Sequence, residues 1–260
     1  MLRSLPEPLG EWPAITNHSK DLAHTVSVAR MQQIDAAAID TIGIPRLLLM
    51  EHAGLAVARL VQQYGSPVST PVLVCCGTGY NGGDGLAAAR HLQAWGYPLR
   101  VLLFGQLAHL RTEPSIYAAI LKGLGVSLMA CSSSPAASTL PGAPTGPALP
   151  REVLDDVQRW LGQNGLIIDA LLGLGARGQV REPMTSVIRW MNQAGHPIIA
   201  VDLPSGLDGD TGCVQGVAVK ATITMTFGLI KQGCMLEQGP SHVGSLMVDA
   251  ITIPQELLTL

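Results

Sequence analysis

The residues best suited to chemistry stand in three polar, glycine-rich stretches that each follow a short apolar run. GTGYNGGDG (77–85) follows PVLVCC, LGLGARG (172–178) follows LIIDAL, and PSGLDGDTG (204–212) follows PIIAVDL. Their carboxylate, amide and hydroxyl groups suit proton transfer and the binding of a cation or a polar ligand. These stretches are therefore the candidate site.

The first stretch carries Gly77, Gly79 and Gly82 at the GxGxxG spacing of a dinucleotide-binding turn. That turn normally works with an acidic residue about 20 positions later, at the end of the second strand, where it binds the ribose hydroxyls. Here the apolar run PLRVLLFGQ ends without a carboxylate, and Asp84 inside the turn would repel a pyrophosphate. An NAD-dependent oxidoreductase is therefore disfavoured.

The remaining residues of this turn indicate how it would meet a ligand. We expect Gly82, Gly83 and Gly85 to take positive φ and to let a ligand approach the backbone closely. Asn81 offers a carbonyl oxygen suited to a hard cation or to a substrate amide. For Asp84 two roles remain open: capping of the following helix and direct contact with the ligand.

Asp169 and Asp202 end two further apolar runs, and we expect them at one rim of a sheet. The carboxyl ends of parallel strands lie along the same edge, and ligands collect in the crevice beyond it. The glycines of GLGARG (173–178) allow close approach, and Arg177 supplies a cation that either pairs with a phosphate or stays solvated. The sequence thus predicts one site built from distant parts of the chain.

Short β-branched runs alternate with longer amphipathic ones from residue 71 onward. This alternation predicts an α/β fold with a mostly parallel sheet and helices on both faces. Two helices precede it, one beginning after Ser27 and one over 48–64, and no helix of ordinary length separates the last two extended segments. We expect strands at 72–76, 98–104, 126–130, 166–171, 197–203, 221–228 and 244–253, and further helices at 86–95, 113–125, 151–162 and 182–195.

Composition narrows the class of protein further. The 260 residues carry a formal charge of −3 with 16 scattered Lys and Arg, which disfavours nucleic-acid binding, and no apolar run is long enough to span a membrane. The first 25 residues do not resemble a secretory signal, so we expect a cytoplasmic protein. We assign residues 1–25 to an N-terminal extension, residues 26–260 to a single domain, and the Pro-, Ser- and Ala-rich segment 131–150 to a flexible surface loop within that domain.

Five ordered motifs resemble those of the YjeF N-terminal domain family, the NAD(P)H-hydrate epimerases. They are MEHAG, GTGYNGGDGLAAARHL, IIDALLGLGARG, VDLPSGLDGDTG and TFGLIKQG, and the similarity covers roughly residues 27–254. The resemblance implies a Rossmann-like three-layer α/β/α domain that interconverts the R and S forms of hydrated NADH and NADPH, called NADHX and NADPHX. It also implies an S-specific NAD(P)HX dehydratase as functional partner and a homodimer through the N-terminal helices.

The resemblance assigns roles by position. Asn81, Asp169 and the backbone carbonyl of Ser205 match the family's potassium ligands, and such oxygen ligands suit K⁺ better than zinc. Asp202 is the expected acid/base catalyst at the hydrated ring carbon. The residues expected to contact the substrate are Tyr80, Asn81, Gly82, Gly83, Asp84, Gly173, Leu174, Gly175, Ala176, Arg177, Gly178, Gln179 and Asp202.

Two positions depart from the family pattern. Tyr80 replaces the first Asn of the usual GNNGGDG, and either stacks on a nicotinamide or adenine ring or shields the loop. His52 replaces the Asn of the usual MENAG, and either titrates near the site or serves as a structural histidine. The alternative function is a catalytically inactive, YjeF-like nucleotide-binding or scaffold protein, although a scaffold has no need of the whole polar rim.

Overall fold

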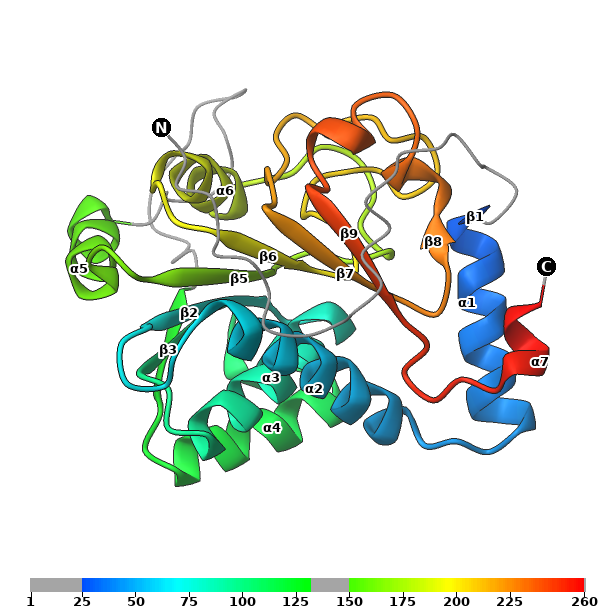
Figure 1. Ribbon diagram of the computed structural model, residues 1–260, viewed down its shortest axis with the longest axis horizontal. Coiled ribbons are helices and arrows are strands. Elements are labelled where there is room, and N and C mark those ends of the chain that lie inside the picture. Colours follow the sequence, from blue (N-terminus) through cyan, green and yellow to red (C-terminus); the bar gives the residue numbers. More distant parts are fainter. Residues whose placement is uncertain (1–24, 132–149, 260) are drawn as a thin grey trace.

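The computed structural model describes residues 25–131 and 150–259, and its centre is a seven-stranded, all-parallel sheet (Figure 1). The strand order is β4-β3-β2-β5-β6-β7-β9. The predicted α/β class with a parallel sheet is confirmed, and all seven predicted strands are present. They are β2 (Val72–Gly77), β3 (Leu99–Phe104), β4 (Ser127–Cys131), β5 (Leu166–Ala170), β6 (Ile198–Val201), β7 (Ile223–Phe227) and β9 (Ser245–Asp249).

Helices cover both faces of the sheet and complete the three layers (Figure 1). Alternate residues of one strand serve opposite cores, since Val74 packs with the helices of one face and Cys75 with those of the other. Burial on both faces explains why these strands appear as continuous apolar runs in the sequence. One face carries α2 (Arg46–Tyr64), α3 (Tyr80–Ala94) and α4 (Thr112–Gly123), and the other carries α5 (Arg151–Leu161) and α6 (Met184–Gln193).

The N-terminal helix starts where the sequence predicts. α1 (Val28–Ala36) begins after Ser27, whose hydroxyl oxygen accepts a hydrogen bond from the Arg30 N–H at 3.1 Å. The expected α-helix does not continue unchanged, because its last part is a π-helix (Ala37–Thr41). The helix then ends before Pro45, the N-cap residue of α2.

A second, two-stranded sheet was not predicted. β1 (Thr25–Val26) pairs in parallel with β8 (Ile230–Lys231), so Val26 lies opposite Lys231. β8 belongs to the connection from β7 to β9. The helical parts of this connection are short 3₁₀ turns, which agrees with the prediction that no helix of ordinary length separates these two strands. The remaining short helices are the 3₁₀ turns Leu107–His109, Gln232–Cys234 and Gly239–Ser241, and α7 (Gln255–Leu258).

Helix α3 begins at Tyr80, well before the expected start at Leu86, and Gly79 is its N-cap. Asp84 therefore lies in the second turn of α3, and of the two roles left open for it, capping of the helix is wrong. The glycine-rich composition of the turn concealed the helix start, because glycine is a poor helix former in isolation.

The glycines of this turn serve close packing. Gly82, Gly83 and Gly85 all lie inside α3 and none has a positive φ, so that expectation is wrong. A Cβ atom on Gly82 would overlap the Gly77 carbonyl oxygen, and one on Gly85 would lie 2.5 Å from the Ala170 Cβ. Their small size lets the first turns of α3 approach β2 and β5, which fixes the start of the helix at the edge of the sheet.

The strand order changes direction between β2 and β5. From β2 the chain moves outward to β3 and β4, and β5 then lies on the other side of β2. In open parallel sheets, ligands bind beyond the carboxyl ends of the strands at such a switch point. The first turn of α3 and the loop after β5 follow directly from these two ends.

Two predicted segments lie almost wholly outside the described residues, namely the N-terminal extension (1–25) and the Pro-, Ser- and Ala-rich loop (131–150). The expectation of a single domain over 26–260 stays a prediction, although one sheet takes strands from both described ranges. Among the helices that are described, none has the length and apolarity needed to cross a membrane.

Candidate active site at the switch point of the sheet

A cavity of about 650 Å³ lies at the switch point. Its walls come from α1, α2, the first turns of α3, the loop after β5 and the ends of β6 and β7. The expected substrate contacts that line it are Tyr80, Asn81, Asp84, Gly173, Leu174, Gly175, Ala176 and Asp202. The expected contacts that do not line it are Gly82, Gly83, Arg177, Gly178 and Gln179.

Asp202 follows β6 in a left-handed backbone conformation, with φ +65°, which is unfavourable for residues other than glycine. Its Oδ1 atom accepts hydrogen bonds from the Thr226 hydroxyl and the Phe227 N–H, both at 3.2 Å, and from the Lys231 ammonium. Its Oδ2 atom accepts no hydrogen bond from the described residues. Because Asp202 lines the cavity, Oδ2 is the oxygen available to a ligand there.

Lys231, on β8, is a cavity residue that the sequence analysis did not single out. Only 1% of its side chain is exposed, and Nζ also donates to the Thr226 hydroxyl at 3.0 Å and to the Phe227 carbonyl at 2.8 Å. A buried ammonium is tolerated only when it is paired and hydrogen-bonded. The signal was present in TFGLIKQG, where one lysine interrupts an otherwise uncharged segment between two predicted strands.

Three further carboxyl groups line the cavity, Asp35 on α1, Asp40 on the π-helix that follows it and Asp84 on α3. Burial raises the pKa of Asp35 to about 6, while the Lys231 charge lowers it and the Asp202 charge raises it. Burial also raises the pKa of Asp84 well above its usual range, and the charges of Asp202 and Asp35 add to that effect. Asp35 was not predicted as a site residue, although it lies one helical turn after Met31 on the expected buried side.

Asp169, at the end of β5, is fully buried and lies behind the cavity wall. Its Oδ1 accepts from the Ser205 hydroxyl at 2.6 Å, and its Oδ2 accepts from the Ser205 N–H at 2.8 Å. Burial raises the pKa of Asp169 to about 6, against the lowering effect of hydrogen bonds from Ser205 and Leu171. This pair joins the loops that follow β5 and β6, as the predicted common rim requires.

Asn81 brings a buried oxygen to the same region. Its side-chain N–H donates to the Leu172 carbonyl at 3.0 Å, whereas Oδ1 is buried and accepts nothing from the described residues. Asp169 and Ser205 also bond to this segment, through the N–H groups of Leu171 and Leu172. The structure therefore brings the three expected potassium ligands together. An unpaired buried acceptor costs about 1–3 kcal/mol, which a bound cation would offset.

Tyr80 contacts two arginines. The guanidinium carbon atoms of Arg46 and Arg111 lie 4.3 Å and 4.5 Å from the centre of its ring, and Arg111 donates to its hydroxyl at 3.3 Å. All three residues line the cavity. Stacking of Tyr80 on a ligand ring would compete with these two groups.

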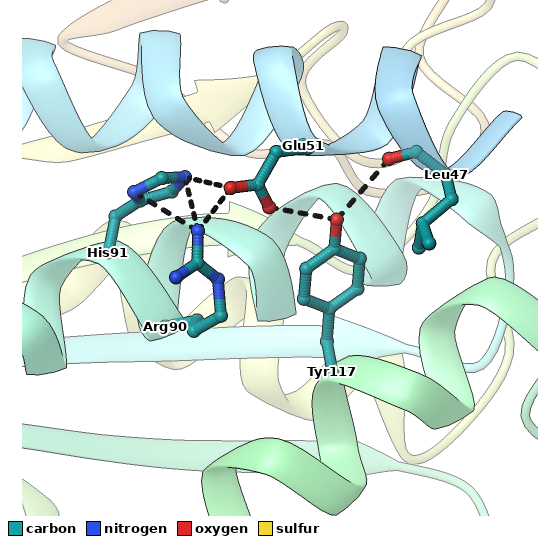
Figure 2. Close-up of polar contacts among 5 residues, drawn as sticks. All are labelled: Leu47, Glu51, Arg90, His91 and Tyr117. Atoms are coloured by element: carbon teal, nitrogen blue, oxygen red, sulfur yellow. Dashed lines mark hydrogen bonds and ion pairs between the residues drawn. The ribbon is translucent and has the colours of Figure 1, made fainter. Parts of the chain in front are cut away.

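Within the MEHAG motif, Met50 and Ala53 line the cavity, whereas Glu51 does not. Glu51 lies between α2, α3 and α4, where its carboxylate contacts Arg90 and His91 and accepts a hydrogen bond from the Tyr117 hydroxyl at 2.9 Å (Figure 2). His52 is not among the residues that line the cavity. The glutamate of the motif therefore fixes three helices relative to one another.

The fold and the site together define a class of protein. A parallel α/β sheet with a cavity at its switch point, several acidic side chains and a mixed polar lining is typical of Rossmann-like domains that bind a nucleotide-sized ligand.

The comparison with known proteins defines the family within that class. The family model described as YjeF-related protein N-terminus matches residues 46–233, and the chain belongs to this family. The bifunctional NAD(P)H-hydrate repair enzyme Nnr of Pyrobaculum aerophilum is 42% identical over 219 residues, which make up 83% of this chain and 39% of that protein. The NAD(P)H-hydrate epimerase of Limosilactobacillus fermentum is 37% identical over 223 residues, 86% of this chain and 94% of that protein.

A solved structure agrees with the fold. The crystal structure of yeast ynu0, YNL200c, matches with a TM-score of 0.65 at 23% identity and covers 86% of each chain. The resemblance inferred from the motifs is thus confirmed. The chain spans about two fifths of the length of the bifunctional relative and nearly the whole length of the epimerase.

Proposed function

We propose that the protein is an NAD(P)H-hydrate epimerase that interconverts the R and S forms of NADHX and NADPHX. The observation that carries this proposal is the carboxylate of Asp202, whose Oδ1 is held by Lys231 and whose Oδ2 is left for a ligand in the cavity. Two relatives named NAD(P)H-hydrate epimerase, 37% and 34% identical over nearly their whole length, support the same activity here.

Epimerisation at the hydrated ring carbon needs one bond to break and to re-form on the opposite face. In the proposed reaction the hydroxyl takes a proton from the protein and leaves as water, while the lone pair of the ring nitrogen forms an iminium-like cation. Water then adds to the other face of the ring and returns a proton to the protein. One water leaves and one water adds, so the ring undergoes no net oxidation.

The residues of the cavity suit these steps. Asp202 Oδ2 is the oxygen proposed to pass the proton to the leaving hydroxyl and to take one from the attacking water, because three donors hold the other oxygen of the same carboxylate. Since the Lys231 ammonium is paired with the Asp202 carboxylate, the proton for the first step is proposed to come from Asp35 in the same cavity, whose pKa burial raises to about 6. Negative charge on these side chains would stabilise the cationic ring.

We also propose that K⁺ binds Asn81, Asp169 and the Ser205 carbonyl. The buried, unpaired Oδ1 of Asn81 supports this assignment. The Ser205 carbonyl already accepts from the Val219 N–H at 2.9 Å, but a carbonyl oxygen has a second lone pair. Within the described ranges no three His, Cys, Asp or Glu side chains are grouped to hold a metal, which favours an ion that accepts neutral oxygens. Bound K⁺ would supply a fixed positive charge at the start of α3.

The proposed functional partner is an S-specific NAD(P)HX dehydratase, which would convert the S form back to NADH or NADPH. The bifunctional repair enzyme among the relatives is more than twice the length of the region it shares with this chain. A homodimer through the N-terminal helices is also proposed, and sedimentation at several protein concentrations would test it.

A coupled assay tests the epimerase proposal. Purified protein is mixed with R-NADHX and an S-specific dehydratase, and the return of NADH absorbance is followed in K⁺ or in Na⁺. We expect acceleration over the spontaneous rate, faster in K⁺, and at least a 100-fold loss in Asp202→Asn. Asp156→Asn, which removes an exposed carboxylate paired with Arg100, is the matched control. A folded wild-type protein that gives no acceleration in either salt would instead favour the scaffold function.

A further inference from the structure

Two positive side chains share one aromatic ring at the wall of the cavity. Arg46 opens helix α2, Arg111 is the N-cap residue of α4, and both guanidinium groups contact the ring of Tyr80, the first residue of α3. Because both guanidinium carbons lie within 4.5 Å of one ring centre, they are no more than about 9 Å apart. Three separate helices thus bring two like charges together.

Neither arginine forms an ion pair with a carboxylate of the described residues, although the Arg46 charge lowers the pKa of the Asp35 and Asp84 carboxyl groups against the raising effect of burial. The ion pairs formed among the described residues involve Arg90, His91, Arg100, Arg159 and Lys231, and none involves Arg46 or Arg111. Two guanidinium groups that repel each other and line a cavity favour an anionic ligand, and the planar guanidinium matches the geometry of phosphate oxygens.

The backbone beside Tyr80 supplies further donors. The N–H groups of Tyr80, Asn81 and Gly82 open helix α3, and none donates to an acceptor among the described residues. The first N–H groups of a helix and the positive end of its dipole favour an anion. These N–H groups lie next to the Tyr80 ring, which both arginines contact. The backbone donors and the two positive charges therefore belong to one region of the cavity.

The cavity carries charges of both signs. The carboxyl groups of Asp35, Asp40, Asp84 and Asp202 line it together with Lys231, and the two arginines gather at Tyr80. A hydrated dinucleotide also combines both signs, because its reacting ring passes through a cationic state in the proposed reaction and its phosphates are anionic. The carboxyl groups suit the ring, and the arginines suit the phosphates.

We propose that Arg46 and Arg111, positioned by the Tyr80 ring, form a binding site for phosphate oxygens of the hydrated dinucleotide. This inference rests on the proposed function for the identity of the substrate. The phosphate is either the pyrophosphate, common to NADHX and NADPHX, or the 2′-phosphate found only in NADPHX. Arg177, for which the sequence left open a phosphate partner or a solvated position, is exposed and does not line the cavity.

Calorimetric titration with unreactive probes tests the site without any need for turnover. Inorganic pyrophosphate, NAD⁺ and NADP⁺ are titrated into the wild-type protein and into Arg46→Gln, Arg111→Gln and the double variant. We expect each single change to weaken binding of at least one probe about tenfold, the double change to weaken it further, and added salt to reduce the differences. Tyr80→Ala should also weaken binding although it removes no charge, whereas Tyr80→Phe, which keeps the ring, should retain most of the affinity.

The pattern of losses identifies the phosphate. An equal loss for NAD⁺ and NADP⁺ assigns the arginines to the pyrophosphate, and a loss confined to NADP⁺ assigns them to the 2′-phosphate. Arg59→Gln removes an exposed arginine of the same helix as Arg46 and should change nothing. Unchanged affinities in the folded double variant, or no binding of any probe by the wild-type protein, would overturn the proposal. Binding losses without epimerase activity would refute the proposed function alone.

Discussion

Two carboxylate clusters of similar composition occupy different places in this molecule. Asp202 is paired with Lys231 in the cavity, and Glu51 is paired with Arg90 and His91 between three helices (Figure 2). Both oxygens of Glu51 have partners, since Oε1 contacts the side chains of Arg90 and His91 and Oε2 accepts from Tyr117. Asp202 receives donors from the described residues on one oxygen only. A fully satisfied carboxylate stabilises the structure, whereas a half-satisfied one beside a cavity is available for chemistry.

The cations of the two clusters, Lys231 and Arg90, also differ in their exposure to solvent. The Lys231 side chain is 1% exposed, against 25% for Arg90, so only the first cation depends wholly on its carboxylate for neutralisation. A buried charge that loses its partner is far more costly than a partly solvated one. The two clusters should therefore respond differently to the loss of one member.

The largest effect is expected for Lys231→Met. It leaves Asp202 without its counter-charge, so the free energy of unfolding should fall by about 3–5 kcal/mol and the epimerase rate by at least 100-fold. Urea denaturation and the coupled assay measure the two quantities. In the double variant with Asp202→Asn, stability should recover in part and activity should not. Lys220→Met, at an exposed lysine, is the control. Full activity in Lys231→Met would contradict the proposal that the Asp202–Lys231 pair takes part in the reaction.

Glu51→Gln should separate stability from activity. The amide keeps the shape of the side chain but loses the charge that holds Arg90 and His91, so we expect a loss of about 1–2 kcal/mol after allowing for solvent screening. The epimerase rate below the melting transition should stay within about twofold of wild type, since Glu51 does not line the cavity. Glu152→Gln, on the exposed side of α5, controls for the loss of a surface charge.

The stability gained by Asp35→Asn should depend on pH. Burial raises the pKa of Asp35 from 3.8 to about 6, so between these values the folded protein keeps a proton that the unfolded chain has lost. Wild-type stability is therefore lost as pH rises through this window. Asp35→Asn should be more stable than wild type by about 1–2 kcal/mol at pH 7.5 and show no gain below pH 4. Denaturation curves at both pH values measure the stability of the two proteins. If the stability difference between Asp35→Asn and wild type is the same at both pH values, Asp35 is not the source of this pH dependence.

The smallest effect is expected for His91→Gln. Burial and the nearby Arg90 charge lower the pKa of His91 below 6.5, while Glu51 acts in the opposite direction. The folded state therefore disfavours the protonated ring, and stability is lost as pH falls through the unfolded value of 6.5. His91→Gln should remove part of that loss. Thermal unfolding at pH 7.5 and 5.5 measures it, and an equal fall in melting temperature for both proteins would contradict the assignment.

The sequence was sufficient to predict the sheet and its rim. Parallel topology places strand ends together, which is why Asp169 and the loop of Asp202 could be assigned to one edge. The helix start at Tyr80 was not predicted, because the glycines that normally indicate a loop serve packing against β2 and β5. Lys231 and Asp35 were missed because their roles depend on contacts between residues far apart in the chain.

The parallel pairing of β1 with β8 connects the cavity to the segment that opens α1. Val26 lies opposite Lys231 in that pairing, and the Val28 N–H donates to Asp210 at 2.6 Å, so both ends of this short segment are attached to the C-terminal half of the fold. The backbone position of Lys231 therefore depends on residues some two hundred positions earlier in the chain. A substitution at Val26 would act on the Lys231 ammonium through one pair of adjacent strands, although Val26 does not line the cavity.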